Sequence, residues 1–184
     1  MEAIICEIER LLERKPRVIV AIEGPCASGK TTLAKALSAS LGATVFHADD
    51  FFLRPSQRTE ERLLEVGGNL DRERFFEEVI SKLSSVDELT YRPYDCHRRM
   101  LSDGVTESLG RVVIVEGSYC MHPDLDEAYD QRIFIDISEE KQRERIEKRN
   151  PQMQKRFFEE WIPMERRYFA QMGIREKCQI QIMA

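Results

Sequence analysis

The sequence has no long apolar run. No stretch approaches the roughly 20 consecutive apolar residues that a membrane-spanning helix needs, and its acidic start, with Glu2, Glu7 and Glu9, is unlike a secretory signal. An excess of positive charge is also absent, because 28 Lys and Arg stand against 33 Asp and Glu. These absences argue against a membrane or a nucleic acid as a partner, and they predict a cytoplasmic protein.

Paired cysteines are absent as well. The five cysteines are scattered and contain no C-x-x-C pair, so neither a disulfide framework nor a zinc site is predicted. The 184 residues are 42% hydrophobic and 33% charged, which predicts one domain over residues 1–184 with a sizeable core. The amphipathic start, which Pro16 stops, predicts a helix beside a sheet and leaves a homo-oligomer through this helix open.

One glycine-rich stretch has a pattern with direct chemical meaning. An apolar, β-branched run at 17–22 precedes it, and an apolar helical stripe from Thr32 to Leu41 follows it. A strand, a glycine loop and a helix in this order are the context of a phosphate-binding loop. The stretch matches the G-x-x-x-x-G-K-[ST] pattern and consists of Gly24, Pro25, Cys26, Ala27, Ser28, Gly29, Lys30 and Thr31.

This loop predicts binding of a nucleoside triphosphate with Mg²⁺. Its glycines let backbone N–H groups turn toward phosphate oxygens, and the helix N-terminus adds unpaired donors. We expect Lys30 to reach the β- and γ-phosphates and the Thr31 hydroxyl to contact Mg²⁺. The predicted ATP-binding residues run from Gly24 to Thr32. Cys26 is either a small tolerated residue or a reactive thiol, because a helix N-terminus and a lysine lower a cysteine pKa.

Acidic residues follow two of the predicted strands. Asp49 and Asp50 come after a short strand at 43–47, and Glu116 follows the β-branched run 111–115. The carboxyl ends of parallel strands line the ligand crevice, so these acids are expected on the same rim as the phosphate loop. Glu116 in this position indicates a Mg²⁺ ligand, directly or through water. The alternatives are that Glu116 merely begins a loop and that Asp49 caps a helix or pairs with an arginine.

The rest of the chain predicts further elements. Segment 53–68 is polar, arginine-rich and aperiodic, which indicates a mobile surface segment that closes over substrate. The mixed stretch 89–99 is too polar for the core. Strands are expected at 132–137 and 178–182, and a helix with a kink at Pro163 is expected at about 155–172.

Taken together, these residues resemble the uridine kinase family of P-loop kinases, which has phosphoribulokinase and nicotinamide riboside kinase relatives. The resemblance runs from Val18 to about Phe169. Besides the phosphate loop, it rests on 49–52, 69–71, 93–95 with His97, 115–117, 129–136 and 157–168.

The resemblance implies a P-loop NTPase fold: a three-layer α/β/α arrangement with a five-stranded parallel sheet and a small helical lid at about 149–156. It implies ATP and Mg²⁺ as cofactors and Asp49 as the catalytic base. By the same analogy the catalytic set includes Lys30, Arg149 and Arg156, the metal ligands are Thr31, Asp49 and Glu116, and the substrate contacts are Asp71, Tyr94 and His97.

Two departures concern the acceptor side. Only Cys96 separates the Tyr94-Asp95 pair from His97, where nucleoside kinases of this kind have several residues, and the short lid contains Pro151. The leading hypothesis is a kinase that phosphorylates a hydroxyl of a nucleoside, uridine or cytidine first, or of a similar polyol. A nucleoside monophosphate kinase is one alternative, with arginines such as Arg54 and Arg58 as the phosphate clamp. A regulatory ATPase that acts through a protein partner is another. The acceptor, the choice between ATP and GTP, and the oligomeric state stay open.

Overall fold

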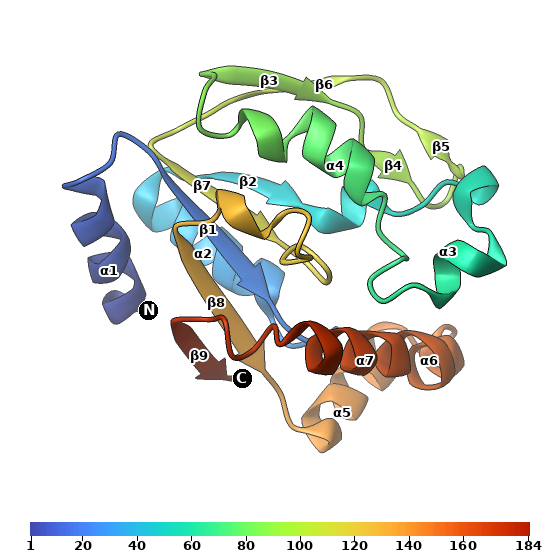
Figure 1. Cartoon of the computed structure of the whole chain (residues 1–184). Helices are drawn as coiled ribbons and strands as arrows, with labels where there is room; N and C mark the ends of the chain where they lie inside the picture. The colour runs from blue at the N-terminus through green and yellow to red at the C-terminus, as the bar shows by residue number, and fades with distance from the viewer.

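The computed structural model describes all residues 1–184 and has a parallel sheet at its centre (Figure 1). The order of strands in the sheet is β2-β7-β1-β8-β9, and every neighbouring pair is parallel. The predicted five-stranded parallel sheet is therefore confirmed. Its strands are β1 (Val18–Glu23), β2 (Thr44–His47), β7 (Val112–Glu116), β8 (Gln131–Asp136) and β9 (Ile180–Met183).

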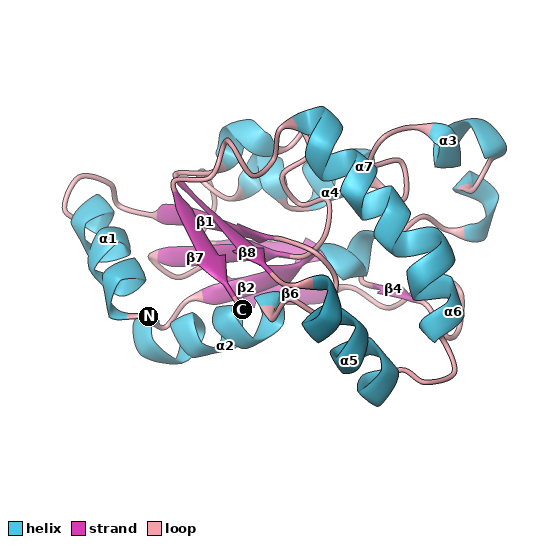
Figure 2. Cartoon of the chain, turned by 90° about the horizontal axis from the view of Figure 1, so that it is seen from below, coloured by secondary structure: helices cyan, strands magenta, loops and turns pink.

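Helices cover both faces of this sheet, as the turned view in Figure 2 shows. The helices of the chain are α1 (Glu2–Leu12), α2 (Lys30–Leu41), α3 (Glu60–Leu64), α4 (Arg72–Glu78), α5 (Glu139–Arg149), α6 (Gln154–Arg156) and α7 (Ile162–Met172). None of these helices has the length and apolar character needed to cross a membrane.

The central strand β1 supplies side chains to two separate cores, because successive residues of a strand point to opposite faces. Val18, Val20 and Ile22 pack with buried residues of α1 and α2. Ile19 and Ala21 pack with buried residues of α4 and α7. All six residues of β1 are buried, which fits the uninterrupted apolar run in the sequence.

Segment 53–68 lies largely at the surface, as its polar sequence predicted, but it contains regular structure. It forms a 3₁₀ turn at Pro55–Gln57 and the short helix α3. Arg62 donates hydrogen bonds to the carbonyls of Gly68 and Leu70 and pairs with Glu73 at 2.7 Å. Arg62 therefore connects this segment to the start of α4.

The expectation that 89–99 stays out of the core is wrong for its apolar side chains. Strand β3 (Glu88–Tyr91) pairs with β6 (Val105–Ser108), and β4 (Tyr94–Asp95) pairs with β5 (Met100–Leu101). Leu89, Tyr91 and Tyr94 are buried. Alternation explains the error, because in β3 the polar residues face out and the apolar ones face in.

The helix expected at 155–172 is present from Gln154 to Met172, and a π-helical turn interrupts its regular α-helical pattern just before Pro163. A π-helical turn at Phe157–Trp161 separates α6 from α7. Because proline has no backbone N–H, the regular hydrogen-bond ladder loses a donor at this point. Helices α6 and α3 lie at the opposite end of the molecule from α1, beyond the carboxyl ends of the central strands (Figure 1).

Candidate active site

The phosphate loop joins β1 to α2, as the sequence predicts. Gly24 has φ 147°, and a Cβ at this position would lie 2.2 Å from the carbonyl oxygen of Ile135 in β8. Only glycine fits so close to a neighbouring strand. Ala27 and Gly29 also have positive φ, at 61° and 108°, and they shape the turn into α2. The loop therefore ends with the N-terminus of α2, where backbone N–H groups have no helical partner.

Lys30 is buried at the mouth of this loop. Its ammonium donates to the carbonyl oxygens of Gly24 at 2.7 Å and Pro25 at 3.0 Å, and it lies 3.4 Å from the hydroxyl of Ser118. All three ammonium protons therefore have protein acceptors. The lysine is held at the place where a terminal phosphate meets a phosphate loop.

Thr31 and Glu116 meet from different elements. The Thr31 hydroxyl donates to Oε1 of Glu116 at 2.9 Å, and the same oxygen lies 2.6 Å from Nδ1 of His47. The hydrogen bond with Glu116 raises the pKa of His47. Sequence reasoning left His47 out of the site, although its position at the end of β2 was the available signal. Gly117 lets the turn at 48–51 approach, because a Cβ there would meet Ala48 at 2.8 Å.

Asp49 lies on the rim of the same crevice, in the 3₁₀ turn at Ala48–Phe51 that follows β2. Its side chain is accessible to water, but the surrounding protein displaces much of the solvent. This desolvation raises the pKa of Asp49; the charge of Glu116 adds to the increase, and Lys30 opposes it. The structure thus brings Asp49, Glu116, Lys30 and Thr31 to one edge of the sheet.

Cys26 is held by two helices that follow it far along the chain. Its N–H donates to Oε2 of Glu165 at 2.9 Å, and its carbonyl accepts from Gln142 at 2.9 Å. Burial raises the pKa of the Cys26 thiol, and the nearby Glu165 carboxylate raises it further. A reactive thiol requires a lowered pKa, and this environment raises it instead. The interpretation of Cys26 as a reactive thiol is therefore wrong.

Three further contacts around the loop were missed in the sequence. Glu165 of α7 also accepts from the Ser118 hydroxyl at 2.6 Å, and Arg145 of α5 donates to the carbonyl oxygens of Ala27 at 2.8 Å and Ser28 at 3.2 Å. A signal for Glu165 existed, since an acid on the apolar stripe of an amphipathic helix needs a partner. Arg145 had no such signal, because it belongs to a helix rich in charged residues.

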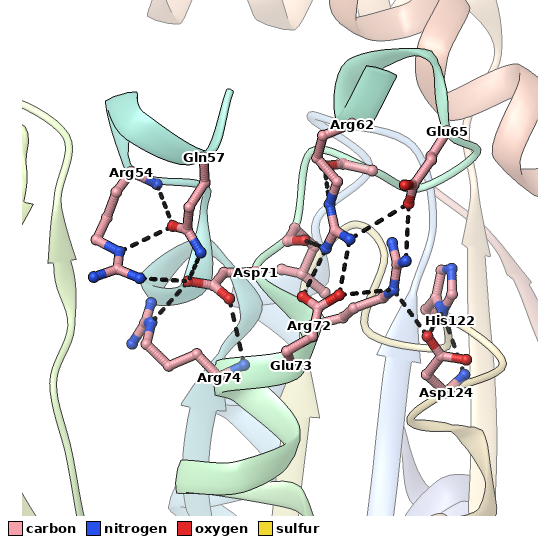
Figure 3. Close-up of polar contacts among 12 residues, drawn as sticks. Arg54, Gln57, Arg62, Glu65, Asp71, Arg72, Glu73, Arg74, His122 and Asp124 are labelled. Carbon is pink, nitrogen blue, oxygen red and sulfur yellow. Dashed lines mark hydrogen bonds and ion pairs between the residues drawn. The ribbon is translucent and has the colours of Figure 1, made fainter. Parts of the chain in front are cut away.

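The expected substrate residue Asp71 is deeply buried and begins α4 (Figure 3). Its Oδ2 accepts from Gln57 at 2.9 Å and from Nε of Arg74 at 3.3 Å, and Arg54 lies 4.0 Å away. Arg74 also donates to the backbone oxygen of Asp50 at 2.9 Å. One arginine therefore ties Asp71 to the turn that carries Asp49.

The other two expected substrate residues differ in exposure. Tyr94 is buried, whereas His97 is exposed in a turn whose backbone is held by Oδ1 of Asp95. Cys96 lies between them. Burial raises the pKa of Cys96, the charges of Asp49 and Asp95 add to this increase, and Arg58 opposes it. This hairpin turn therefore lies close enough to Asp49 for the charge of Asp49 to affect the pKa of Cys96.

The two lid arginines make no hydrogen bond or ion pair with the phosphate loop. Arg149 is the last residue of α5 and is exposed. Arg156 pairs with Glu160 at 3.2 Å, and its guanidinium lies 4.9 Å from the centre of the Trp161 ring. Their catalytic role stays a prediction that requires the lid to move.

No cluster of three or more histidine, cysteine or acidic side chains forms a metal site in the protein. The available oxygen donors are those of Thr31, Glu116 and Asp49. Such a set fits Mg²⁺ that arrives with a nucleotide, because this ion keeps several waters and takes only one or two carboxylates beside the phosphates.

The architecture and site define a class of fold. A parallel sheet in the order found here, with a phosphate loop after its central strand and helices on both faces, is the fold of the P-loop kinases, and solved structures of that class match most of the chain. No family model and no curated protein matches the sequence. The predicted resemblance to uridine kinase-like proteins is confirmed for the fold.

Three solved structures illustrate this similarity. A "Possible Uridine Kinase" from Bacillus stearothermophilus has a TM-score of 0.71 and 22% identity over 99% of this chain and 100% of that chain. A "putative fructose transport system kinase" from Silicibacter sp. has a TM-score of 0.71 and 21% identity over 96% and 97%. D-glycerate 3-kinase from Cryptococcus neoformans has a TM-score of 0.55 and 14% identity over 89% and 86%.

Proposed function

We propose that the chain is an ATP-dependent small-molecule kinase that transfers the γ-phosphoryl group to a hydroxyl. The convergence of four side chains on one edge of the sheet is the observation that carries this proposal. They are Lys30, Thr31, Glu116 and Asp49, and they come from the phosphate loop and from the ends of two strands. They supply the cation, the metal ligands and the base that phosphoryl transfer needs.

The nucleotide half of the site uses the phosphate loop. Backbone N–H groups at the start of α2 bind phosphate oxygens, and Lys30 exchanges the carbonyl oxygens of Gly24 and Pro25 for oxygens of the β- and γ-phosphates. Bound Mg²⁺ supplies positive charge to these phosphates, with Thr31, Glu116 and Asp49 as its protein oxygens, directly or through water.

Asp49 is the base in this proposal. It accepts the proton of the acceptor hydroxyl while the hydroxyl oxygen forms a bond to the γ-phosphorus and the bond from this phosphorus to the oxygen of ADP breaks. Transfer passes through a loose transition state, so orientation of the hydroxyl contributes more than deprotonation. The raised pKa of Asp49 brings this carboxyl closer to a pKa suited to proton transfer at neutral pH.

A nucleoside such as uridine or cytidine is the first acceptor that we propose, with Asp71, Tyr94 and His97 around it. The similar structures named for uridine, fructose and glycerate support a hydroxyl acceptor of this general kind. The enclosure of the Asp71 carboxylate by Gln57 and Arg74 means that an acceptor has to share or displace these partners.

A nucleoside monophosphate is the competing acceptor. Arg54 beside Asp71 and Arg58 near Cys96 favour it, because guanidinium groups at this rim suit a second phosphate. A third possible function for a chain with this phosphate loop is a regulatory ATPase that acts through a protein partner.

ADP release from Mg·ATP tests these proposals. The panel contains nucleosides, nucleoside monophosphates, sugars and glycerate, with Asp49→Asn measured in parallel. Stimulation by a hydroxyl compound that falls by at least about 100-fold in Asp49→Asn is the expected result. If only nucleoside monophosphates stimulate ADP release, the proposed acceptor is a nucleoside monophosphate and not a nucleoside. Rapid turnover that no small acceptor changes would favour the regulatory ATPase and contradict the kinase.

A further inference from the structure

Glu165 is an acid on the buried face of α7, between the buried residues Ile162 and Tyr168. Both of its carboxylate oxygens are used. Oε2 accepts from the N–H of Cys26 at 2.9 Å, and Oε1 accepts from the Ser118 hydroxyl at 2.6 Å. Because an unpaired buried carboxylate is costly, these contacts fix how α7 is placed against the phosphate loop.

The carboxylate also fixes the direction of the Ser118 hydroxyl. A carboxylate can only accept hydrogen bonds, so the Ser118 proton points to Glu165 and a lone pair of its oxygen remains free. The ammonium of Lys30 lies 3.4 Å from that oxygen. Glu165, Ser118 and Lys30 are each less than 10% exposed, so water does not compete for these contacts.

Helix α5, which precedes the lid, also contacts the phosphate loop. Gln142 and Arg145 of α5 donate to the carbonyl oxygens of Cys26 and Ala27. Helix α5 ends at Arg149 and α7 begins at Ile162, so the lid lies between two helices that both contact the loop. A displacement of either helix therefore acts on the phosphate loop directly.

We propose that Glu165 is a positioning residue that acts through Ser118 to hold the Lys30 ammonium at the mouth of the phosphate loop. This inference rests on the proposed kinase function. When a triphosphate enters, Lys30 leaves the carbonyl oxygens of Gly24 and Pro25, and the Ser118 contact keeps the ammonium on the side of the terminal phosphate. The helix that follows the lid is thereby linked to the cation that meets the transferred group.

Ser118→Ala is the sharpest test, because it removes the link to Lys30 and leaves the bond between Glu165 and Cys26 in place. We expect kcat to fall about tenfold and ATP affinity to fall by a similar factor, with ADP affinity changed less than twofold. Calorimetry with ATP and ADP measures the affinities without turnover. A small hydroxyl deletion of this kind also leaves the backbone contacts of the loop intact.

Glu165→Gln is a second test of the positioning role. The amide accepts only through its oxygen, so one of the two contacts is lost and the hydroxyl of Ser118 is no longer forced toward Glu165. Its loss of kcat should match or exceed that of Ser118→Ala, and the double variant should be no worse than Glu165→Gln alone. Arg166→Gln is the matched control on α7, because Arg166 is exposed and pairs only with Glu139.

The outcomes separate the two proposals. Wild-type chain that transfers phosphate while Ser118→Ala retains its kcat and its ratio of ATP to ADP affinity overturns the positioning role alone. Equal weakening of ATP and ADP also overturns it, because a purely structural clamp would affect both nucleotides alike. Wild-type chain that binds no nucleotide overturns the kinase proposal together with this one.

Discussion

Arg74 connects several parts of the proposed acceptor side. Its guanidinium donates to the Asp71 carboxylate, to the backbone oxygens of Asp50 and Arg92, and stacks 4.3 Å from the centre of the Phe51 ring. It is largely buried. The turn that carries Asp49 is therefore held in place by a residue that makes no hydrogen bond to the phosphate loop.

Replacing Arg74 by Lys should impair the acceptor side selectively. Lysine keeps the charge but has no planar fork for several acceptors at once. We expect kcat/KM for the acceptor to fall about tenfold or more, with KM for ATP changed less than threefold. Steady-state kinetics with each substrate varied in turn measures this, and Arg10→Lys on the surface is the control. Equal losses for both substrates would contradict the assignment.

Glu23 predicts a particular dependence of stability on pH. Burial raises its pKa to about 7, and it accepts hydrogen bonds from the N–H groups of Tyr119 and Met121. Because the folded pKa exceeds the unfolded one, stability from this group is present below about pH 4.5 and is lost as pH rises toward 7. Between these values the free energy of unfolding should fall by up to about 1.4 kcal/mol per pH unit.

Urea unfolding between pH 5 and 8 checks this sign. Glu23→Gln should be less stable at pH 5, since its amide nitrogen faces N–H donors, and its stability should depend less on pH than that of wild-type chain. His47 has a raised pKa and contributes in the same direction, so the comparison is the difference between the two slopes. If the free energy of unfolding depends on pH equally in wild-type chain and in Glu23→Gln, burial does not raise the pKa of Glu23.

Residue patterns that are local in the chain were predictable. The positions of Lys30, Thr31 and Glu116 at one edge of the sheet were predictable, because a glycine-rich loop and the end of a strand can be recognised from a few consecutive residues. Ser118 and Glu165 were not, since their contact spans 47 positions and depends on how α7 is rotated. The idea of a low thiol pKa at Cys26 was wrong because the thiol is buried, which raises its pKa, and because α7 adds a carboxylate beside it.

At the level of elements, the proposed lid has to move before Arg149 or Arg156 can take part in catalysis. Arg156 directly precedes the π-helical turn Phe157–Trp161, and its guanidinium lies over the ring of Trp161. π-Helical turns are frequent at functional sites. Closure of the lid over a nucleotide would require Arg156 to leave this stack.

Trp161 is the single tryptophan and therefore reports on this step. We expect saturating Mg·ATP to change its fluorescence emission, because the cation over its ring departs. Arg156→Ala should shift the emission of the free protein toward that of the bound state and reduce the change on binding. Unchanged emission while calorimetry shows bound ATP would contradict lid closure through Arg156.

Element prediction failed where tertiary contacts overrode composition. Segment 53–68 had no periodicity, yet its Arg62 donates to the carbonyl of Leu70 and pairs with Glu73 of α4, and Arg167 of α7 donates to the carbonyl of Leu64. The helix expected at 155–172 does continue through Pro163, but it contains a π-helical turn at Phe157–Trp161 that the sequence did not predict. The parallel strands were predictable, because buried β-branched runs admit few other structures.

At the scale of the whole molecule, the sheet gathers residues from distant segments. Strands β2, β7 and β1 are neighbours, so Asp49, Glu116 and the phosphate loop meet although they are far apart in sequence. The fold agrees with the P-loop kinases, and the sequence identity of 22% or less leaves the chemistry to be tested on this chain.

Transfer of label from [γ-³²P]ATP to a small hydroxyl compound tests the central claim most directly. Wild-type chain with Mg²⁺ should yield a labelled acceptor, Asp49→Asn should bind ATP but lose transfer, and Lys30→Met should lose both. Full transfer by Asp49→Asn, or label that appears only as free phosphate with every acceptor, would contradict the account.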